Sequence, residues 1–130
     1  MGHVTVVGSF MYDLVATVPR RPRAGETLVG DSFGMFLGGK GANQAIAASR
    51  AGATVTMIGR LGNDLFGKQF LEKFSQEGIN TDFVVQDKEN GTGIGMPLID
   101  SSGDNSIVII PQANMALTVK NINQAEASIA

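Results

Sequence analysis

The spacing of apolar residues divides the chain into two parts. In the first eighty residues, short β-branched runs at 3–7 and 55–59 alternate with amphipathic stretches at 42–51 and 65–77. This strand–helix order predicts βαβ units and an α/β fold with a buried parallel sheet. From 83 to 110, three strand-like runs follow one another with only polar turns between them. Strands connected in that way are normally antiparallel or lie at a sheet edge.

The second amphipathic stretch has the clearest helix signals. Asp64 stands where a capping residue is expected, Phe66, Phe70 and Phe74 recur at every fourth position, and Gly78 marks the end. We therefore place the three phenylalanines in the core rather than in a surface that stacks nucleic-acid bases.

Two further segments have weaker patterns. Residues 27–36 favour strands, but Gly30 and Gly34 interrupt them, which predicts short, bent strands outside the main core. Near the end, Thr118 is expected to cap one last helix with apolar residues at 119, 122, 125 and 129. Because that helix would reach the chain end without a stop signal, the pattern indicates a truncated chain.

Composition removes several classes of function. The chain has 130 residues, a net charge of -2, one histidine and no cysteine. Scattered basic residues and few aromatics disfavour nucleic-acid binding, and the missing cysteines disfavour disulfides, thiolate chemistry and zinc. No apolar run is long enough to span a membrane and no targeting signal opens the chain, so we expect a soluble protein, compatible with the cytoplasm.

A glycine-rich block precedes the first helix and is the strongest candidate for chemistry. Gly38, Gly39 and Gly41 give the backbone freedom for a close turn into a helix, whose first N–H groups attract anions and hydroxyl oxygens. Lys40 and Asn43 would share one face of that helix and offer a charge and an amide to a small polar ligand. The alternative is a loop that only connects two elements.

Two other segments can contribute to a site. Residues 9–13 follow the first strand, so Asp13 is expected in a loop at the carboxyl end of the sheet, where α/β proteins bind ligands, although Asp also serves as a turn former. Gly93, Gly95 and Pro97 alternate with apolar residues, which leaves one strand face nearly bare. That face has room for a ligand, or it is an ordinary edge protected by proline.

Together these features resemble the N-terminal portion of the ribokinase-like (PfkB) carbohydrate kinase family. The resemblance covers essentially the whole chain in order and at family spacing. Its motifs are Gly8-Ser9, Asp13-Leu14, Pro22, Gly25-Glu26-Thr27, the block from Gly38 to Gln44, Gly62 with Asp64, Phe66-Gly67 and Thr92-Gly93.

The resemblance implies an N-terminal fragment of a three-layer sandwich, a parallel sheet between helices, with residues 1–130 forming part of one kinase domain. A small β-sheet lid, built from segments near 14–37 and 92–110, would close over a sugar and pair two subunits of a homodimer. Asp13 would accept hydrogen bonds from sugar hydroxyls, and Gly38 with Gly39 would act as a hinge. The substrate-binding residues implied in this way are Met11, Asp13, Gly38, Gly39, Lys40, Gly41, Asn43, Gly95, Pro97 and Ile109.

Two positions depart from the family pattern. Met11 stands where many family members that bind ribose carry Asn, and it lacks strong hydrogen-bonding groups. Gln112 stands where the family usually has Gly in a Gly-Ala-Asn turn, and Gln tolerates a positive φ poorly.

The family's catalytic base and most of its nucleotide site lie in a later Gly-Ala-Gly-Asp motif, which this sequence does not contain. The resemblance therefore implies that the chain alone has no catalytic residues and no kinase activity. The parent would transfer the γ-phosphoryl group of ATP to the 5-hydroxyl of ribose, with Mg²⁺ and a monovalent cation such as K⁺. The alternatives are a kinase for a nucleoside or another sugar, or a sugar-binding or dimerising fragment without chemistry.

Overall fold

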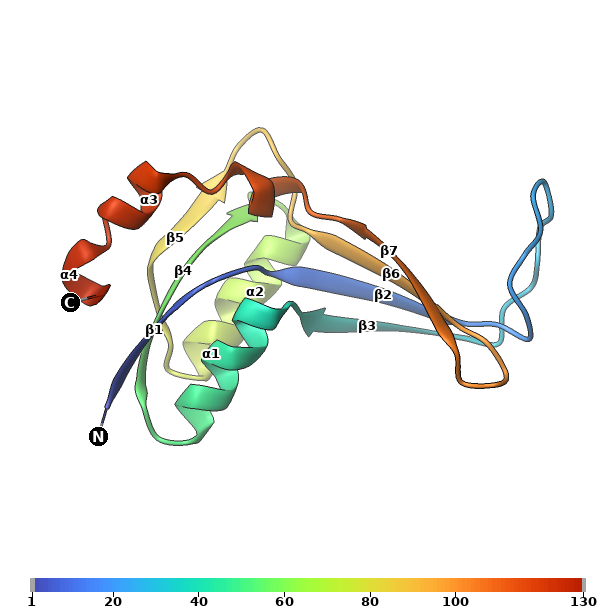
Figure 1. The fold of residues 1–130 in the computed structure, drawn as a ribbon, viewed down its shortest axis with the longest axis horizontal. Helices are drawn as coiled ribbons and strands as arrows, with labels where there is room; N and C mark the ends of the chain where they lie inside the picture. The colour runs from blue at the N-terminus through green and yellow to red at the C-terminus, as the bar shows by residue number, and fades with distance from the viewer. Residues whose placement is uncertain (1, 130) are drawn as a thin grey trace.

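A parallel sheet and a mixed sheet form the framework of the molecule (Figure 1). The computed structural model describes residues 2–129, so Met1 and Ala130, the ends of the expected 1–130 unit, lie outside the described residues. The parallel sheet has the order β1-β4-β5, with strands His3–Val7, Thr54–Gly62 and Asn80–Asp87. The mixed sheet has the order β3-β2-β6-β7, with strands Ser32–Gly38, Met11–Thr17, Ile94–Ile99 and Asn105–Ile110.

Helices α1 (Lys40–Arg50) and α2 (Leu65–Gln76) cover one side of the parallel sheet. The expected signals of α2 are present: the Asp64 carboxylate accepts a hydrogen bond from the Gly67 N–H at 2.8 Å, and Gly78 ends the segment at a φ of 70°. Phe70 and Phe74 are completely buried, while Phe66 is half-buried against Tyr12. The βαβ prediction is therefore confirmed for this part of the chain.

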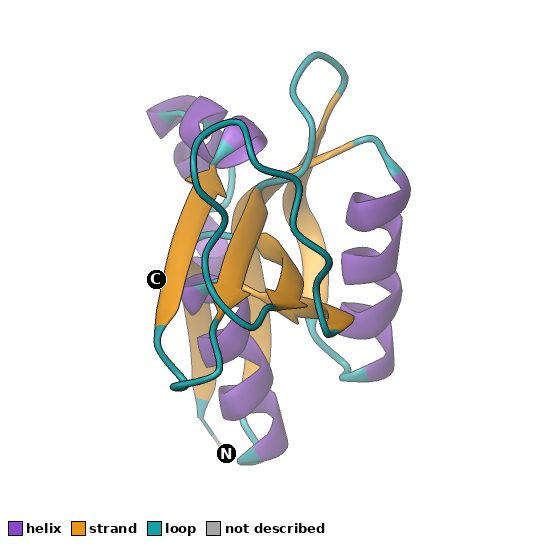
Figure 2. Ribbon diagram, turned by 90° about the vertical axis from the view of Figure 1, so that its right-hand side faces the viewer, coloured by secondary structure: helices purple, strands orange, loops and turns teal. Residues whose placement is uncertain are grey.

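The mixed sheet extends away from the helices as an arm, and the loop between β2 and β3 lies at its far end (Figures 1 and 2). Its central pair, β2 and β6, is parallel, and β3 and β7 add antiparallel strands on the two sides. Residues that lie opposite one another in such pairs share a face, so Asp13, Gly95 and Ile109 lie on one face and Leu14, Met35 and Met96 on the other.

Several expectations about strands were wrong. Asp13 lies within β2 and not in a loop, because the chain enters a second sheet directly after the first strand. The expectation for the three runs at 83–110 was met, since β6 and β7 pair antiparallel and β5 lies at a sheet edge, where it pairs in parallel with β4. Strand β1 is only partly buried because it too is an edge strand. The segment 27–36 lies outside the main core as expected, but residues 27–31 form no strand and the rest belongs to one continuous strand, β3, in place of short, bent strands.

The expected last helix is broken in two. Helix α3 (Val119–Asn123) begins with the expected cap at Thr118, and α4 (Glu126–Ile129) follows after a turn. The turn buries Ala125 completely and brings the carbonyl of Ser128 to the hydroxyl of Thr5, on the side of the parallel sheet opposite α1. No helix within residues 2–129 is long and apolar enough to cross a membrane.

Candidate functional site

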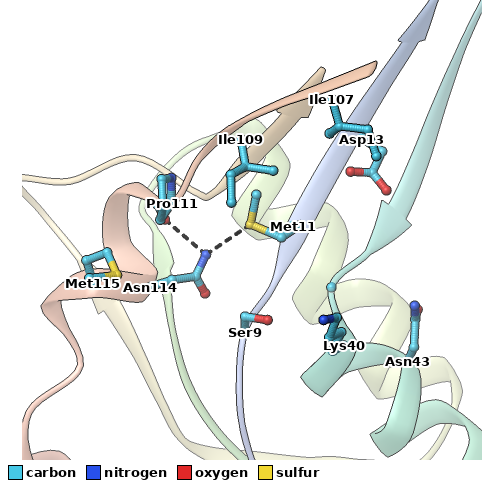
Figure 3. A pocket seen from close by; sticks show the side chains of 11 residues that line it. Ser9, Met11, Asp13, Lys40, Asn43, Ile107, Ile109, Pro111, Asn114 and Met115 are labelled. Carbon is cyan, nitrogen blue, oxygen red and sulfur yellow. Dashed lines mark hydrogen bonds between the residues drawn. The ribbon is translucent and has the colours of Figure 1, made fainter. Parts of the chain in front are cut away.

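A cavity of about 420 Å³ lies where the two sheets meet (Figure 3). Its walls come from the start of β2, the first turn of α1, strand β7 and the 3₁₀ turn that follows β7 at Gln112–Ala116. The lining residues are Ser9, Met11, Asp13, Gly39, Lys40, Asn43, Ile107, Ile109, Pro111, Asn114 and Met115.

Among residues 2–129, the carboxylate of Asp13 is the only acidic group that lines this cavity. It occupies space that side chains at Gly38 and Gly95 would fill, because a Cβ at Gly38 would lie 2.7 Å from its Oδ2 and a Cβ at Gly95 would overlap its Oδ1. Partial burial raises the pKa of Asp13 above its ordinary value, and within residues 2–129 no hydrogen bond lowers it. The carboxylate is thus free to accept hydrogen bonds from a ligand.

Lys40 and Asn43 face Asp13 from the first turn of α1 (Figure 3). The helix can begin here because Gly39 adopts a φ of 97°, and any side chain on it would lie 2.7 Å from the Met11 nitrogen and the Ser9 oxygen. Gly41 packs its Cα against Gly8 at the end of β1. The glycine block therefore places a cation and an amide on the wall of the same cavity as a carboxylate.

The opposite wall of the cavity is apolar. Ile107 and Ile109 alternate along β7 and point inward, and Met11, Pro111 and Met115 complete the wall (Figure 3). One side of the cavity can therefore bond hydroxyl groups while the other contacts carbon. This combination suits a small polyhydroxylated molecule with a less polar face.

The structure brings six of the ten predicted site residues to the wall of one cavity. They are Met11, Asp13, Gly39, Lys40, Asn43 and Ile109. Gly38 and Gly95 flank the Asp13 carboxylate, and Gly41 supports the start of α1 from behind. Pro97 lies further along β6 and lines a separate hollow of about 310 Å³ with Leu14 and Met96.

Sequence reasoning missed five lining residues, namely Ser9, Ile107, Pro111, Asn114 and Met115. Two signals were available for some of them. Ile107 has the same period-two phase as Ile109 in a strand-like run, and Ser9 directly follows the first strand. For the 3₁₀ turn that carries Asn114 and Met115, the resemblance to a Gly-Ala-Asn turn did indicate a turn beginning at Gln112, but it assigned no residue of that turn to the site.

Residues 2–129 contain no group of three or more His, Cys, Asp or Glu side chains that could hold a metal ion.

Comparisons with known proteins show the family of the chain. The model of the pfkB family carbohydrate kinase matches residues 1–130. The chain is 40% identical over 126 residues to ribokinase from Mus musculus and 44% identical over 120 residues to ribokinase from Bacillus subtilis. These matches cover 97% and 91% of this chain but 39% and 40% of those proteins, so the chain spans about two-fifths of the length of the curated relatives it matches.

The fold agrees as well. The structure of Arabidopsis thaliana ribokinase complexed with ribose and ATP superposes with a TM-score of 0.80 at 34% identity, covering 87% of this chain and 36% of that chain. The predicted ribokinase-like α/β fold, a parallel sheet with helices and a small second sheet, is therefore confirmed. The chain belongs to the pfkB family of carbohydrate kinases.

Proposed function

We propose that this chain forms the sugar-binding and lid part of an ATP-dependent ribokinase, which converts ribose to ribose 5-phosphate. Because the chain corresponds to about two-fifths of its relatives, the activity is a property of the whole protein. The relatives that are 40% and 44% identical to this chain are ribokinases, and one ribokinase of the same fold has a structure with ribose and ATP.

The observation that carries this proposal is the position of the Asp13 carboxylate. It lies between two glycines, it receives no hydrogen bond within residues 2–129, and it faces Lys40 and Asn43 across the cavity. A carboxylate accepts hydrogen bonds from two neighbouring hydroxyls of a sugar, while the amide of Asn43 and the ammonium of Lys40 donate to other oxygens. The apolar wall then contacts the carbon side of the sugar.

In this proposal the mixed sheet is a lid. It carries Asp13, Gly95 and Ile109, and it joins the body of the molecule at Gly39, whose φ of 97° allows an abrupt change of chain direction. Closure over the sugar would exclude water, which would otherwise compete for the phosphoryl group.

ATP, Mg²⁺ and a monovalent cation such as K⁺ would bind mainly outside the residues described here. When bound, the Mg²⁺ would neutralise the charge that develops on the transferred phosphoryl group. The residues of this chain would bind and orient the sugar and exclude water. We place the enzyme in the cytoplasm, since it draws on ATP.

We also propose that the lid pairs with the lid of a second copy to form a homodimer. One face of the mixed sheet exposes Phe33, Met35, Met96 and Val108. Apolar side chains gathered on one face favour association with another protein surface.

The test is a calorimetric titration of the full-length protein with ribose, 2-deoxyribose and a nucleoside, together with a coupled assay of ADP release. Ribose-dependent ADP release and saturable ribose binding are expected. Binding of a nucleoside with no response to either sugar would contradict the ribokinase proposal and favour a nucleoside kinase. Met11 makes 2-deoxyribose an informative control, because it offers no strong hydrogen bond to a hydroxyl.

A further inference from the structure

Two side-chain amides project from the 3₁₀ turn that follows β7, and both bond to backbone that is distant in sequence. Asn114 accepts a hydrogen bond from the Phe10 N–H at 2.9 Å and donates to the Phe10 carbonyl at 2.7 Å, so its amide pairs with both polar groups of one residue. It also donates to the Pro111 carbonyl at 3.0 Å and lies 3.4 Å from the sulfur of Met11 (Figure 3). Asn114 thereby fixes the segment that leads into β2.

Gln112 does the same for β6. Its amide nitrogen donates to the Thr92 carbonyl at 2.7 Å, two residues before β6 begins. Gln112 has a φ of 47°, which is unfavourable for a residue other than Gly, Asn or Asp. The bond to Thr92 is one compensation for this backbone conformation.

The glycines on either side of Thr92 leave room for these amides. A Cβ at Gly91 would lie 2.9 Å from the Gln112 Oε1, and a Cβ at Gly93 would overlap the Asn114 amide. The space left by the missing side chain at Gly91 is therefore occupied by the Gln112 amide, and that at Gly93 by the Asn114 amide. At these two positions the space is filled by protein and not by a ligand.

Thr92 in turn is fixed to the body of the molecule. It is completely buried, its N–H and hydroxyl donate to the Asp64 carboxylate at the start of α2, and its hydroxyl accepts from the Gly62 N–H. The Tyr12 N–H donates to the Gly93 carbonyl at 2.8 Å, which connects the starts of β2 and β6. A short path of hydrogen bonds therefore runs from α2 through Thr92 to both central strands of the mixed sheet.

We propose that Gln112 and Asn114 form an amide clamp, a pair of positioning residues that hold the starts of β2 and β6 and so set where Met11, Asp13 and Gly95 lie. This inference rests on the proposed function for its link to sugar binding. The clamp acts on three of the four strands of the mixed sheet, because it also follows directly from the end of β7. The fourth strand, β3, joins α1 through Gly39.

The first test needs no ligand. In the full-length protein, Asn114→Ala is expected to speed amide hydrogen exchange at Phe10 about tenfold, since one hydrogen bond is lost, while exchange at Met57 in the core of β4 changes little. A residue that only adds global stability would speed exchange at Met57 as well. Unchanged exchange at Phe10, or an equal increase at Met57, would overturn the clamp.

Gln112→Gly is the second variant, and it removes the amide while relieving the backbone at this position. Because glycine adopts a φ of 47° without strain, we expect this variant to fold. It is also expected to speed exchange at Tyr12, whose partner Gly93 adjoins the released Thr92. Unchanged exchange at Tyr12 would remove Gln112 from the clamp.

The second test measures sugar binding. Asn114→Ala is expected to raise the Kd for ribose about tenfold, because the Asp13 carboxylate loses its fixed position, whereas the exposed Asn123→Ala serves as the matched control and keeps the wild-type Kd. Equal ribose affinity in wild type and Asn114→Ala would overturn the link between clamp and site. A wild-type protein that does not bind ribose would overturn the proposed function instead, and the exchange measurements would still decide whether the clamp exists.

Discussion

The two sheets of this protein use apolar residues in opposite ways. Around the parallel sheet, Phe10, Met57, Phe70 and Phe74 are at most 1% exposed and pack into one core against α1 and α2. In the mixed sheet, large apolar side chains remain on the surface. Phe33 is 65% exposed, and the other exposed side chains are Met35, Phe36, Met96, Ile107, Val108 and Ile109. The apolar residues around the parallel sheet stabilise the fold, while those of the mixed sheet are available to contact a ligand or another protein surface.

Ion pairs follow the same division. In the body, Arg60 pairs with Asp87, whose side chain is 3% exposed and also accepts hydrogen bonds from Asn90. At the far end of the mixed sheet, Arg21 pairs with Asp100, and this pair is more exposed, at 38% for the arginine side chain and 14% for the aspartate. Removing one partner of a buried ion pair lowers the free energy of unfolding strongly, because the other charge is left buried and unpaired, whereas an exposed ion pair contributes little to that free energy. We therefore expect the free energy of unfolding to depend mainly on the body, while the mixed sheet contributes Asp13 to a recognition site that it shares with Lys40 and Asn43 of α1.

The largest effect is expected in the core of the body. Phe70→Ala removes a completely buried ring whose centroid lies 5.0 Å from that of Phe10, and it should lower the free energy of unfolding by about 3–5 kcal/mol. Phe33→Ala in the mixed sheet is the matched control and should change it by no more than about 0.5 kcal/mol. Urea unfolding of dilute protein measures both. Equal losses would mean that the mixed sheet has a core of its own.

The second effect concerns the junction of the two regions. Gly39→Val would place a β-branched side chain at a φ of 97°, and its Cβ would overlap the backbone of Ser9 and Met11. The variant should therefore lose measurable ribose binding and have a lower melting temperature. Gly103→Val has a similar φ of 86°, but nothing lies near its added Cβ, so it isolates the conformational cost. Calorimetry and thermal unfolding compare the two variants. If both lose the same amount, close packing at Gly39 has no special role.

The third effect is confined to recognition. Asp13→Asn keeps the shape of the side chain but removes the charge, and it should weaken ribose binding by roughly ten- to hundred-fold, equivalent to about 1.5–3 kcal/mol. Removing a carboxylate whose pKa is raised by burial should not reduce stability at neutral pH, because the ionised form is the one that burial disfavours. Calorimetric titration decides this, with Asp31→Asn on the exposed loop as control. Unchanged affinity would remove Asp13 from the site.

The body could be predicted from the sequence because its signals are local. Asp64, Phe70 and Phe74 act within one helix, and the βαβ order determines which strands become neighbours. The glycine block also identified the start of α1, since a backbone at a φ of 97° and in contact with Ser9 tolerates no side chain.

The mixed sheet could be predicted only in part, because its pairing is not local. Nothing near Asp13 in the sequence indicates that β2 pairs with β6, some eighty residues later, so the residue was expected in a loop. The amide clamp was missed for the same reason, since Asn114 bonds to a residue 104 positions away. The sequence shows that Gln112 replaces the usual glycine of this turn, but only the structure shows that a hydrogen bond to the Thr92 carbonyl compensates for its positive φ.

The smallest effect compares the two ion pairs through pH. The guanidinium of Arg60, with backbone N–H groups of Asn90 and Glu89, holds the pKa of Asp87 far below its ordinary value, and hydrogen bonds from Ser102 and Arg21 lower the pKa of Asp100 less. A lowered pKa contributes stability that is present above the unfolded value of about 3.9 and is lost as the pH falls toward the folded value. The wild-type melting temperature should therefore fall below about pH 4. In Asp87→Asn the melting temperature should decrease less between about pH 4 and lower pH, while in Asp100→Asn it should decrease nearly as much as in the wild type. Thermal unfolding between about pH 2.5 and pH 6 measures all three, and an equal flattening in both variants would show that the exposed pair contributes as much as the buried one.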